Sequence, residues 1–253
     1  MPPVNVSPFM EWDRTSPVTE KTVYTDAEIF TAPPGAIAWL IEPIHGRQDA
    51  YDFLIERSKT LKEIWTCDRA LLQMISNGVF VPFGGCWIHP DHRTIWNKTK
   101  SISTITSRHR GNVGYDLRHE TVARFRDRID CFGIEYTPLE LKIDALRDYR
   151  FHVVIENVQC DYWFTEKLID CFATGTIPIY RGCPSIGDFF DLDGMIIVQT
   201  IDDIGAAFEK CTPEYYSRHE AAILNNFVRA KQFYLSEDWL CLNHREKMEQ
   251  LTI

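Results

Sequence analysis

Between residues 101 and 210, short apolar runs alternate with segments of helical periodicity, and few folds accommodate such an alternation. The clearest run is Phe151–Glu156 (FHVVIE), which predicts a strand buried on both faces. After it, Phe164–Thr174 places apolar side chains at helical spacing and stops before Gly175, a typical helix terminator. Strands that alternate with helices in this way indicate a parallel, doubly wound sheet, so we expect an α/β fold.

The first half of the chain carries a shorter version of the same pattern. Ala36–Ile41 (AIAWLI) is a continuous apolar run, as in a buried parallel strand. The other elements expected here are a strand at Ile64–Thr66 and helices at Tyr51–Ser58 and Arg69–Ser76. A long connection with Pro and Gly residues then ends near Asn97, where we place a domain junction. This predicts a short N-terminal domain at 1–98 and a C-terminal domain at 99–253.

The elements expected in the second half place the candidate ligand site. Further strands are expected at Ser101–Thr106, Cys131–Phe132, Ile177–Tyr180 and Met195–Val198, and helices at Arg118–Ile129, Leu139–Asp148, Ile201–Lys210 and Tyr215–Tyr234. In parallel sheets, ligands bind at the carboxyl ends of the strands. We therefore expect the site at the loops after Thr106, Glu156 and Tyr180.

Charge and cysteine content exclude several classes of protein. The chain has 27 Lys and Arg against 36 Asp and Glu, a net charge of −9, which argues against nucleic acid or an anionic membrane as partner. Its eight cysteines are scattered singly and form no CxxC pair, so we expect no zinc or dithiol site. With no apolar stretch of spanning length and no signal-peptide pattern at the N-terminus, we expect a cytoplasmic protein without a transmembrane segment.

The loop after the strand Phe151–Glu156 has the residues best placed for chemistry. It begins with Asn157 and leads to Thr165, Glu166 and Lys167, which open the next helix. A helix N-terminus carries about +0.5 of an elementary charge and unpaired N–H groups, which suits a phosphate. Lys167 adds a full charge there, and Glu166 can accept hydrogen bonds from a ribose diol. The alternative is that Thr165 and Glu166 only cap the helix while Lys167 is solvated.

This stretch resembles the donor-binding motif of the family 10 fucosyltransferases, whose common form is FENS, a short loop and Y-x-TEK. Here it reads IENVQCDYWFTEK, and the spacing from Asn157 to Lys167 agrees without a gap. The similarity is strong over roughly residues 100–200 and weak before them. It implies a GT-B fold of two Rossmann-like domains with parallel, doubly wound sheets. It also implies inverting transfer of L-fucose from GDP-fucose to a glycan hydroxyl.

Functional positions of that family carry over to this sequence one by one. Its Asn falls on Asn157 and its Glu-Lys pair on Glu166 and Lys167, for which it implies contacts with ribose and diphosphate. Its phosphate-binding arginine, at the start of the first helix of the C-terminal domain, corresponds to Arg118. A guanidinium can grip a diphosphate bidentately, although a surface arginine at the junction is the alternative. Ser107, at the end of the preceding strand, is a further candidate phosphate ligand.

Two positions depart from the family pattern. Trp163 stands where the family commonly has Tyr, and Val158 replaces the Ser of FENS. An indole can stack or donate from its N–H, but it has no phenol hydroxyl. Trp163 stays among the candidate donor-binding residues, and a different nucleotide sugar is an alternative donor.

An inverting transfer also needs a base that takes the proton of the acceptor hydroxyl. In the family this is a carboxylate after an early strand of the N-terminal domain, and Glu42, directly after the run AIAWLI, corresponds to it. A partly desolvated carboxylate facing a cleft has the raised pKa that suits this role. An ordinary Glu at a strand end is the alternative, and Glu156 and Asp161 are rival bases.

Taken together, these residues predict an inverting, α-1,3-fucosyltransferase-like glycosyltransferase that uses GDP-fucose as donor substrate. We expect no metal or other cofactor, and a nucleotide sugar and a glycan acceptor as partners. The alternatives are the same fold with another nucleotide sugar, or a non-catalytic module that binds a nucleotide or a glycan. The acceptor, the linkage and the oligomeric state are not predicted.

Overall fold

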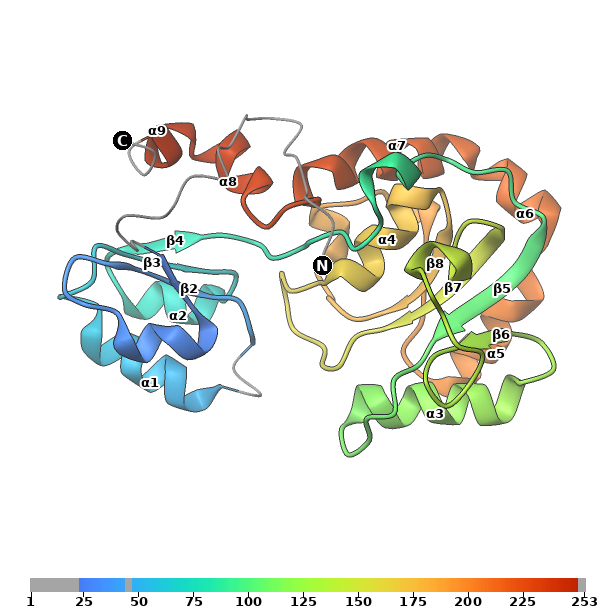
Figure 1. Cartoon of the computed structure of the whole chain (residues 1–253), viewed down its shortest axis with the longest axis horizontal. Coiled ribbons are helices and arrows are strands. Elements are labelled where there is room, and N and C mark those ends of the chain that lie inside the picture. Colours follow the sequence, from blue (N-terminus) through green and yellow to red (C-terminus); the bar gives the residue numbers. More distant parts are fainter. Residues whose placement is uncertain (1–22, 44–46, 250–253) are drawn as a thin grey trace.

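Two parallel β-sheets lie side by side in the computed structural model, which describes residues 23–43 and 47–249 (Figure 1). The first sheet has the strand order β1-β2-β3-β4 and the second β6-β5-β7-β8-β9, with every neighbouring pair parallel. The strands are β1 (Val23–Thr25), β2 (Ile37–Leu40), β3 (Glu63–Thr66), β4 (Gly78–Phe80), β5 (Lys100–Ile105), β6 (Asp130–Phe132), β7 (Tyr149–Ile155), β8 (Ile177–Arg181) and β9 (Ile196–Ile197).

Helices connect these strands and continue past the last one. They are α1 (Gln48–Arg57), α2 (Arg69–Met74), α3 (Val113–Phe125), α4 (Glu166–Thr174), α5 (Ile201–Lys210), α6 (Pro213–Arg218), α7 (Glu220–Ala230), α8 (Asp238–Asn243) and α9 (Arg245–Glu249). A short 3-10 turn, η4 (Lys142–Ala145), precedes β7. The alternation of strands and helices expected from the sequence is confirmed.

Strand β7 occupies the centre of the second sheet, between β5 and β8. Its side chains alternate between two cores: Val154 packs with α4, whereas Phe151 and Val153 pack with the side of the sheet covered by α3 and α5. Because both faces are covered, the strand reads as an unbroken apolar run. Its carboxyl end is fixed in the middle of the sheet and leads directly to α4.

The ends of α4 follow from its sequence. The Thr165 side chain accepts a hydrogen bond from the Lys167 backbone N–H and caps the helix, and Gly175 ends it in the left-handed region at φ 72°. All residues from Leu168 to Thr174 are buried. The helix start is therefore held rigidly beside the end of β7.

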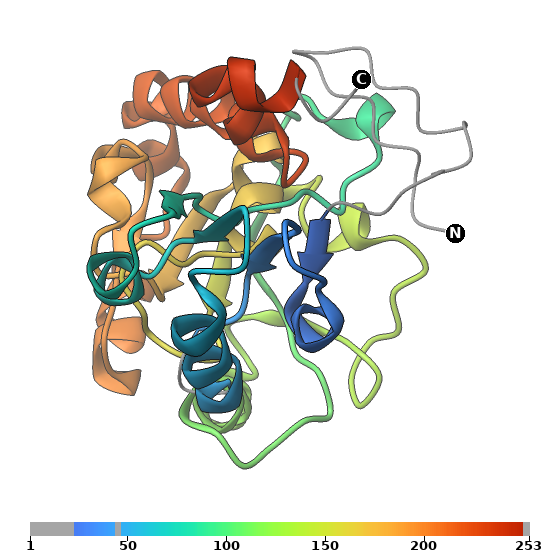
Figure 2. The same cartoon turned by 90° about the vertical axis from the view of Figure 1, so that its left-hand side faces the viewer.

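The C-terminal part of the chain returns to the first sheet. Leu240 and Cys241 of α8 share a core with Trp39 and Trp65, and Lys247 of α9 pairs with Glu63. Figure 1 shows α8 and α9 above the first sheet, and Figure 2 shows that sheet in front of the second. The two sheets are thus joined both by the connection after β4 and by these helices. The domain boundary at residues 98 and 99 stays a proposal.

Two expected helices differ from the structure. The prediction of a helix at Leu139–Asp148 is wrong, because only η4 forms there. Ser103 Oγ donates a hydrogen bond to the carbonyl of Ala145, and Lys98 Nζ donates one to the carbonyl of Leu146. The long helix at Tyr215–Tyr234 is broken between α6 and α7. There the His219 ring bonds to the Tyr215 carbonyl at 2.7 Å, in place of the backbone N–H that would continue the helix.

The first helix of the second sheet starts earlier than expected. The sequence placed it at Arg118–Ile129, but α3 begins at Val113, because the Asn112 side chain accepts the Tyr115 N–H at 2.8 Å and caps it. Arg118 therefore lies in the second turn of the helix and not at its start.

Candidate active site

A cavity of about 430 Å3 opens at the carboxyl ends of β5 and β7. Its walls come from the segment between β5 and α3, from β7, from the region of η4 and from the start of α4. Trp87, in the connection between the two sheets, completes it. The predicted site residues that line this cavity are Ser107, Arg118, Asn157, Glu166 and Lys167.

Arg118 reaches from α3 across to the end of β7. It is 6% exposed, and its Nε and Nη2 atoms donate to the Ile155 carbonyl at 2.8 and 2.5 Å. Nη2 also donates to Asn157 Oδ1 at 2.6 Å. Burial lowers the pKa of the guanidinium, which nevertheless stays charged at neutral pH. Within the described chain, Nη1 has no hydrogen-bond partner, so this end of the guanidinium is available to a ligand.

Lys167 is held at the start of α4 by three oxygen atoms. Its Nζ lies 3.1 Å from Thr165 Oγ1, 3.3 Å from Glu166 Oε1 and 3.6 Å from Glu156 Oε2. Glu156 is fully buried and accepts the Thr165 N–H at 2.9 Å, so it anchors the helix start from below. The ammonium of Lys167 is therefore fixed at the cavity wall while its side chain keeps 29% exposure.

Glu166 stands between two lysines. Its Oε1 atom lies 3.3 Å from Lys167 Nζ and 3.9 Å from Lys142 Nζ. Burial alone would raise the pKa of Glu166, but the two ammonium groups outweigh it and lower the pKa. The carboxylate thus stays ionised and can only accept hydrogen bonds.

Of the two remaining candidates for donor binding, Ser107 lines the cavity and Trp163 does not. Ser107 lines the cavity two residues after β5 ends, and its Oγ accepts the His109 N–H at 3.4 Å. Trp163 does not line it: the side chain is 3% exposed, and its indole Nε1 has no partner among the described residues. The structure therefore brings Ser107, but not Trp163, to the other donor-site candidates.

Glu42 approaches the cavity from the first sheet. It follows β2 and is anchored by its backbone N–H, which donates to Asp26 Oδ1 at 3.2 Å. Desolvation and the neighbouring charge of Asp26 raise the pKa of Glu42, while Lys167 and Arg47 act in the opposite direction. Glu42 is not a lining residue of the cavity, but the charges of two residues that line it act on its pKa: Lys167 lowers it and Glu166 raises it.

The sequence reasoning missed Lys142, His152 and Trp87, which also line the cavity. Lys142 Nζ lies 2.5 Å from Asp170 Oδ2 and 4.7 Å from the centre of the Trp87 ring. Asp170, fully buried on α4, also accepts the Trp87 backbone N–H at 2.7 Å. No motif marks these residues, because parallel pairing and the connection between the sheets assemble them from distant segments.

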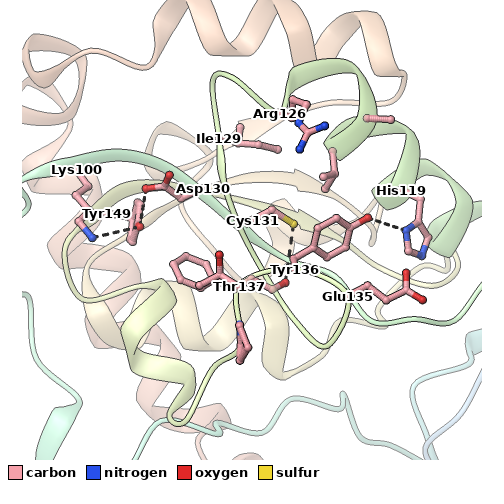
Figure 3. Close-up of a pocket in the computed structure, with 14 residues that line it drawn as sticks. Lys100, His119, Arg126, Ile129, Asp130, Cys131, Glu135, Tyr136, Thr137 and Tyr149 are labelled. Atoms are coloured by element: carbon pink, nitrogen blue, oxygen red, sulfur yellow. Dashed lines mark hydrogen bonds between the residues drawn. The ribbon is translucent and has the colours of Figure 1, made fainter.

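A larger cavity of about 1110 Å3 lies at the outer edge of the second sheet, between β6, the end of α3 and the starts of β5 and β7 (Figure 3). The Tyr149 hydroxyl donates to Asp130 Oδ2 at 2.7 Å and accepts from Lys100 Nζ at 3.4 Å. The Tyr136 hydroxyl lies 3.1 Å from His119 Nδ1. These polar side chains satisfy one another, and none of the predicted site residues lines this cavity. The candidate site is therefore the smaller cavity.

Across residues 23–43 and 47–249, no cluster of three or more His, Cys, Asp or Glu side chains is arranged to hold a metal ion. No helix in the part of the chain that the structure describes is long and apolar enough to span a bilayer.

The two parallel sheets and the cavity at the end of the second are the features of a GT-B fold. A crystal structure of alpha1,3-fucosyltransferase with GDP matches with a TM-score of 0.56 at 14% identity, over 87% of this chain and 78% of that chain. The structure of Anabaena HepE in complex with UDP-glucose matches with a TM-score of 0.58 at 9% identity, over 87% and 72%. At such identities the likeness concerns the fold alone, and the expected GT-B fold is confirmed.

Sequence comparison gives a more specific similarity for the C-terminal part of the chain. Residues 95–200 match the model of glycosyltransferase family 10 (fucosyltransferase), C-terminal part. Alpha-(1,3)-fucosyltransferase FucT of Helicobacter pylori is 32% identical over 84 residues, which are 33% of this chain and 17% of that protein. This part of the chain is therefore similar to glycosyltransferase family 10. The match spans about a sixth of that relative, and every candidate except Glu42 falls within residues 95–200.

Proposed function

We propose that this chain is an inverting glycosyltransferase that transfers L-fucose from GDP-fucose to a hydroxyl of a glycan acceptor. The observation that carries the proposal is that Arg118, Asn157, Glu166 and Lys167 line one cavity inside the family 10 segment. In this proposal the second sheet and its helices bind the donor, and the first sheet supplies the acceptor side.

The diphosphate of the donor occupies the space between Arg118 and Lys167. Arg118 offers Nη1 there, and Lys167 and the N-terminus of α4 add positive charge. When the bond to the sugar breaks, negative charge accumulates on the leaving diphosphate. Cations that are already fixed in position stabilise that charge without reorganising.

Glu166 is suited to the ribose of the nucleotide. Its pKa is lowered by the two neighbouring lysines, so its oxygens accept hydrogen bonds from the two ribose hydroxyls at neutral pH. Arg118 donates a hydrogen bond to the side chain of Asn157, and Asn157 lines the same cavity as Glu166. Ser107 contributes a hydroxyl to the same cavity.

Glu42 acts as the base. Its carboxylate takes the proton of the acceptor hydroxyl, and the hydroxyl oxygen attacks the anomeric carbon from the face opposite the diphosphate. The bond between that carbon and the phosphate oxygen breaks, and GDP leaves with the bonding electrons. The raised pKa of Glu42 supports this role, because a base with a pKa closer to neutrality accepts the proton more readily.

A second candidate is the same chemistry with another nucleotide sugar. It is favoured by Trp163, which stands at the family's tyrosine position but lies buried outside the cavity. A non-catalytic nucleotide- or glycan-binding module is the remaining alternative.

The deciding experiment is thermal unfolding with matched concentrations of GDP, UDP, CMP or ADP, followed by transfer assays with GDP-fucose over a panel of glycans. A ligand at a hundredfold excess over its Kd stabilises the native state by about 2.7 kcal/mol. We expect stabilisation by GDP alone and release of GDP in the presence of an acceptor. Stabilisation by UDP instead of GDP would indicate that the donor is a UDP-linked sugar and not GDP-fucose. GDP binding without turnover on any glycan would support the binding module.

A matched pair of variants shows where the nucleotide binds. Lys167→Ala removes the ammonium at the cavity wall and should abolish the stabilisation by GDP. Lys100→Ala removes an ammonium at the other cavity and should retain it. Equal loss in both variants would contradict the assignment of the cavity.

A further inference from the structure

His152 is a buried residue of the candidate site that the proposed chemistry does not use. It lies in the middle of β7, is 6% exposed and lines the same cavity as Arg118 and Lys167. Because side chains alternate along a strand, His152 faces the side of the sheet that also holds Val154. This is the side on which η4 and α4 lie.

The hydrogen bonds of His152 fix its tautomer. Its Nδ1 atom lies 2.7 Å from Ser103 Oγ, and Ser103 Oγ donates its single hydrogen to the Ala145 carbonyl at 2.5 Å. The serine oxygen can therefore only accept from the imidazole, so Nδ1 carries the proton. In a neutral ring, Nε2 is then an acceptor.

The ring is neutral over the whole physiological range. Burial first, and then the charges of Lys142 and Lys98, lower the pKa of His152 to about 3. Within the described residues, Nε2 has no hydrogen-bond partner. It also keeps some solvent contact, unlike the fully buried side-chain atoms that have no partner. Its lone pair therefore reaches the cavity, where a ligand can satisfy it.

The position of His152 indicates which part of a nucleotide it meets. Ile155, whose carbonyl binds Arg118, follows it by three residues, so at ~3.3 Å per residue the backbone at His152 lies about 10 Å from the Arg118 end of the cavity. Lys142 connects the two ends: it lies 3.9 Å from Glu166, the candidate ribose ligand, and its charge acts on His152. The order along the cavity is diphosphate, ribose and then His152.

We propose that His152 Nε2 accepts a hydrogen bond from an N–H group on the Watson–Crick edge of guanine and so contributes to the choice of nucleotide. The inference rests on the proposed function. Guanine presents two adjacent donors, N1–H and the 2-amino group, whereas uracil presents one N–H between two carbonyl oxygens. Glu140 lines the same cavity and supplies a second acceptor. A buried acceptor that is held in place, as His152 is, rejects a base that leaves it unpaired.

Calorimetric titration with GDP and with inorganic pyrophosphate tests this assignment. His152→Phe keeps a planar ring and leaves Ser103 bonded to Ala145, but it removes the acceptor. We expect its affinity for GDP to fall about 10- to 100-fold, the effect of an unmade hydrogen bond. Its affinity for pyrophosphate, which has no base, should stay that of the parent protein. Lys167→Ala serves as the converse control, because it should weaken both ligands.

The other outcomes are equally informative. An unchanged GDP affinity in His152→Phe overturns the inference, as does an equal loss of GDP and pyrophosphate, which would show a collapsed cavity. If the parent protein binds pyrophosphate but prefers UDP to GDP, guanine recognition is wrong while the phosphate site stands. If it binds neither ligand, the proposed function fails together with the inference.

A measurement on the unaltered protein avoids any dependence on the variant's folding. Long-range 1H–15N spectra report which imidazole nitrogen carries the proton, and we expect a neutral His152 protonated at Nδ1. GDP should shift the Nε2 resonance, and pyrophosphate should leave it in place. An Nε2-protonated ring, or a shift caused equally by pyrophosphate, would overturn the inference.

Discussion

Asn157 Oδ1 accepts a hydrogen bond from Arg118 Nη2 at 2.6 Å, which ties the loop after β7 to helix α3 inside the candidate donor cavity. The same guanidinium also binds the Ile155 carbonyl, so one side chain closes the end of the strand and orients the first loop residue. Arg118 thus has a positioning role toward Asn157 in addition to the phosphate contact proposed for Nη1.

Replacement of Arg118 by Ala should therefore remove two contributions at once. We expect kcat/KM for GDP-fucose to fall about 10²- to 10³-fold, as for the loss of one preorganised donor. Arg126→Ala is the matched control, because Arg126 lies just past α3 and lines the other cavity. Steady-state kinetics of the two variants check this, and equal activities would mean that Arg118 does not contact the donor.

Gly114, in the first turn of α3, is packed against the same loop. A Cβ atom built on Gly114 lies 2.6 Å from the Asn157 carbonyl oxygen and 2.7 Å from its Cα, so Gly114→Ala must displace the loop. We expect a loss of about 1–3 kcal/mol of stability, as for other overpacked sites. GDP binding should weaken as well.

Thermal unfolding with and without GDP measures both effects. Gly187→Ala is the control, because the three atoms nearest to its added Cβ all belong to the Leu192 side chain, at 3.3 Å or more, and neither residue lines the cavity. A Gly114→Ala protein that binds GDP like the parent would show that the loop's position does not matter for binding.

Much of this arrangement follows from local sequence. The apolar run of β7, the cap at Thr165 and the stop at Gly175 each have local causes, and these place Asn157, Glu166 and Lys167 together. Helix α5 has the expected bounds, Ile201–Lys210, since its capping box and apolar spacing are both local features.

Other parts depend on contacts between distant segments. The carbonyls of Ala145 and Leu146 are taken by Ser103 and Lys98, and no local pattern reveals that these residues meet. His152 and Lys142 join the cavity for the same reason. Trp163 shows the reverse case, because alignment with a family position could not reveal that its indole is buried away from the cavity.

Asp170 is expected to be a stability determinant beside the site. It pairs with Lys142 Nζ at 2.5 Å and accepts the Trp87 N–H at 2.7 Å. Asp170→Asn keeps an acceptor for Trp87 but leaves the ammonium of Lys142 with only the more distant carboxylate of Glu166, at 3.9 Å. We expect a loss of about 1.5–3 kcal/mol, the range for hydrogen bonds to charged groups.

Urea denaturation of Asp170→Asn measures this loss. Asp188→Asn, at a carboxylate remote from the cavity, is the comparison and should change the midpoint little. If both variants unfold at the same urea concentration as the parent, the pair of Asp170 and Lys142 does not contribute to stability.

Glu42 makes the sharpest prediction about mechanism. Glu42→Gln removes the base but not the donor cavity, so transfer should fall by at least about 10²-fold. GDP affinity should be unchanged. A variant with normal turnover would exclude Glu42 as the base, and Glu156 and Asp161 would then have to be tested.

A comparison of pH profiles gives an independent test of Glu42 as the base. The parent enzyme is compared with a variant of Asp26, in which Glu42 itself is unchanged. Desolvation and the Asp26 charge raise the pKa of Glu42, and only the ionised form acts as base, so kcat/KM should fall as the pH drops through this raised pKa. Asp26→Asn keeps an oxygen for the Ile41 and Glu42 N–H groups and tolerates the left-handed φ of 42°, but it removes the charge. The acidic limb should therefore move to lower pH, and an unmoved limb would show that another group controls it.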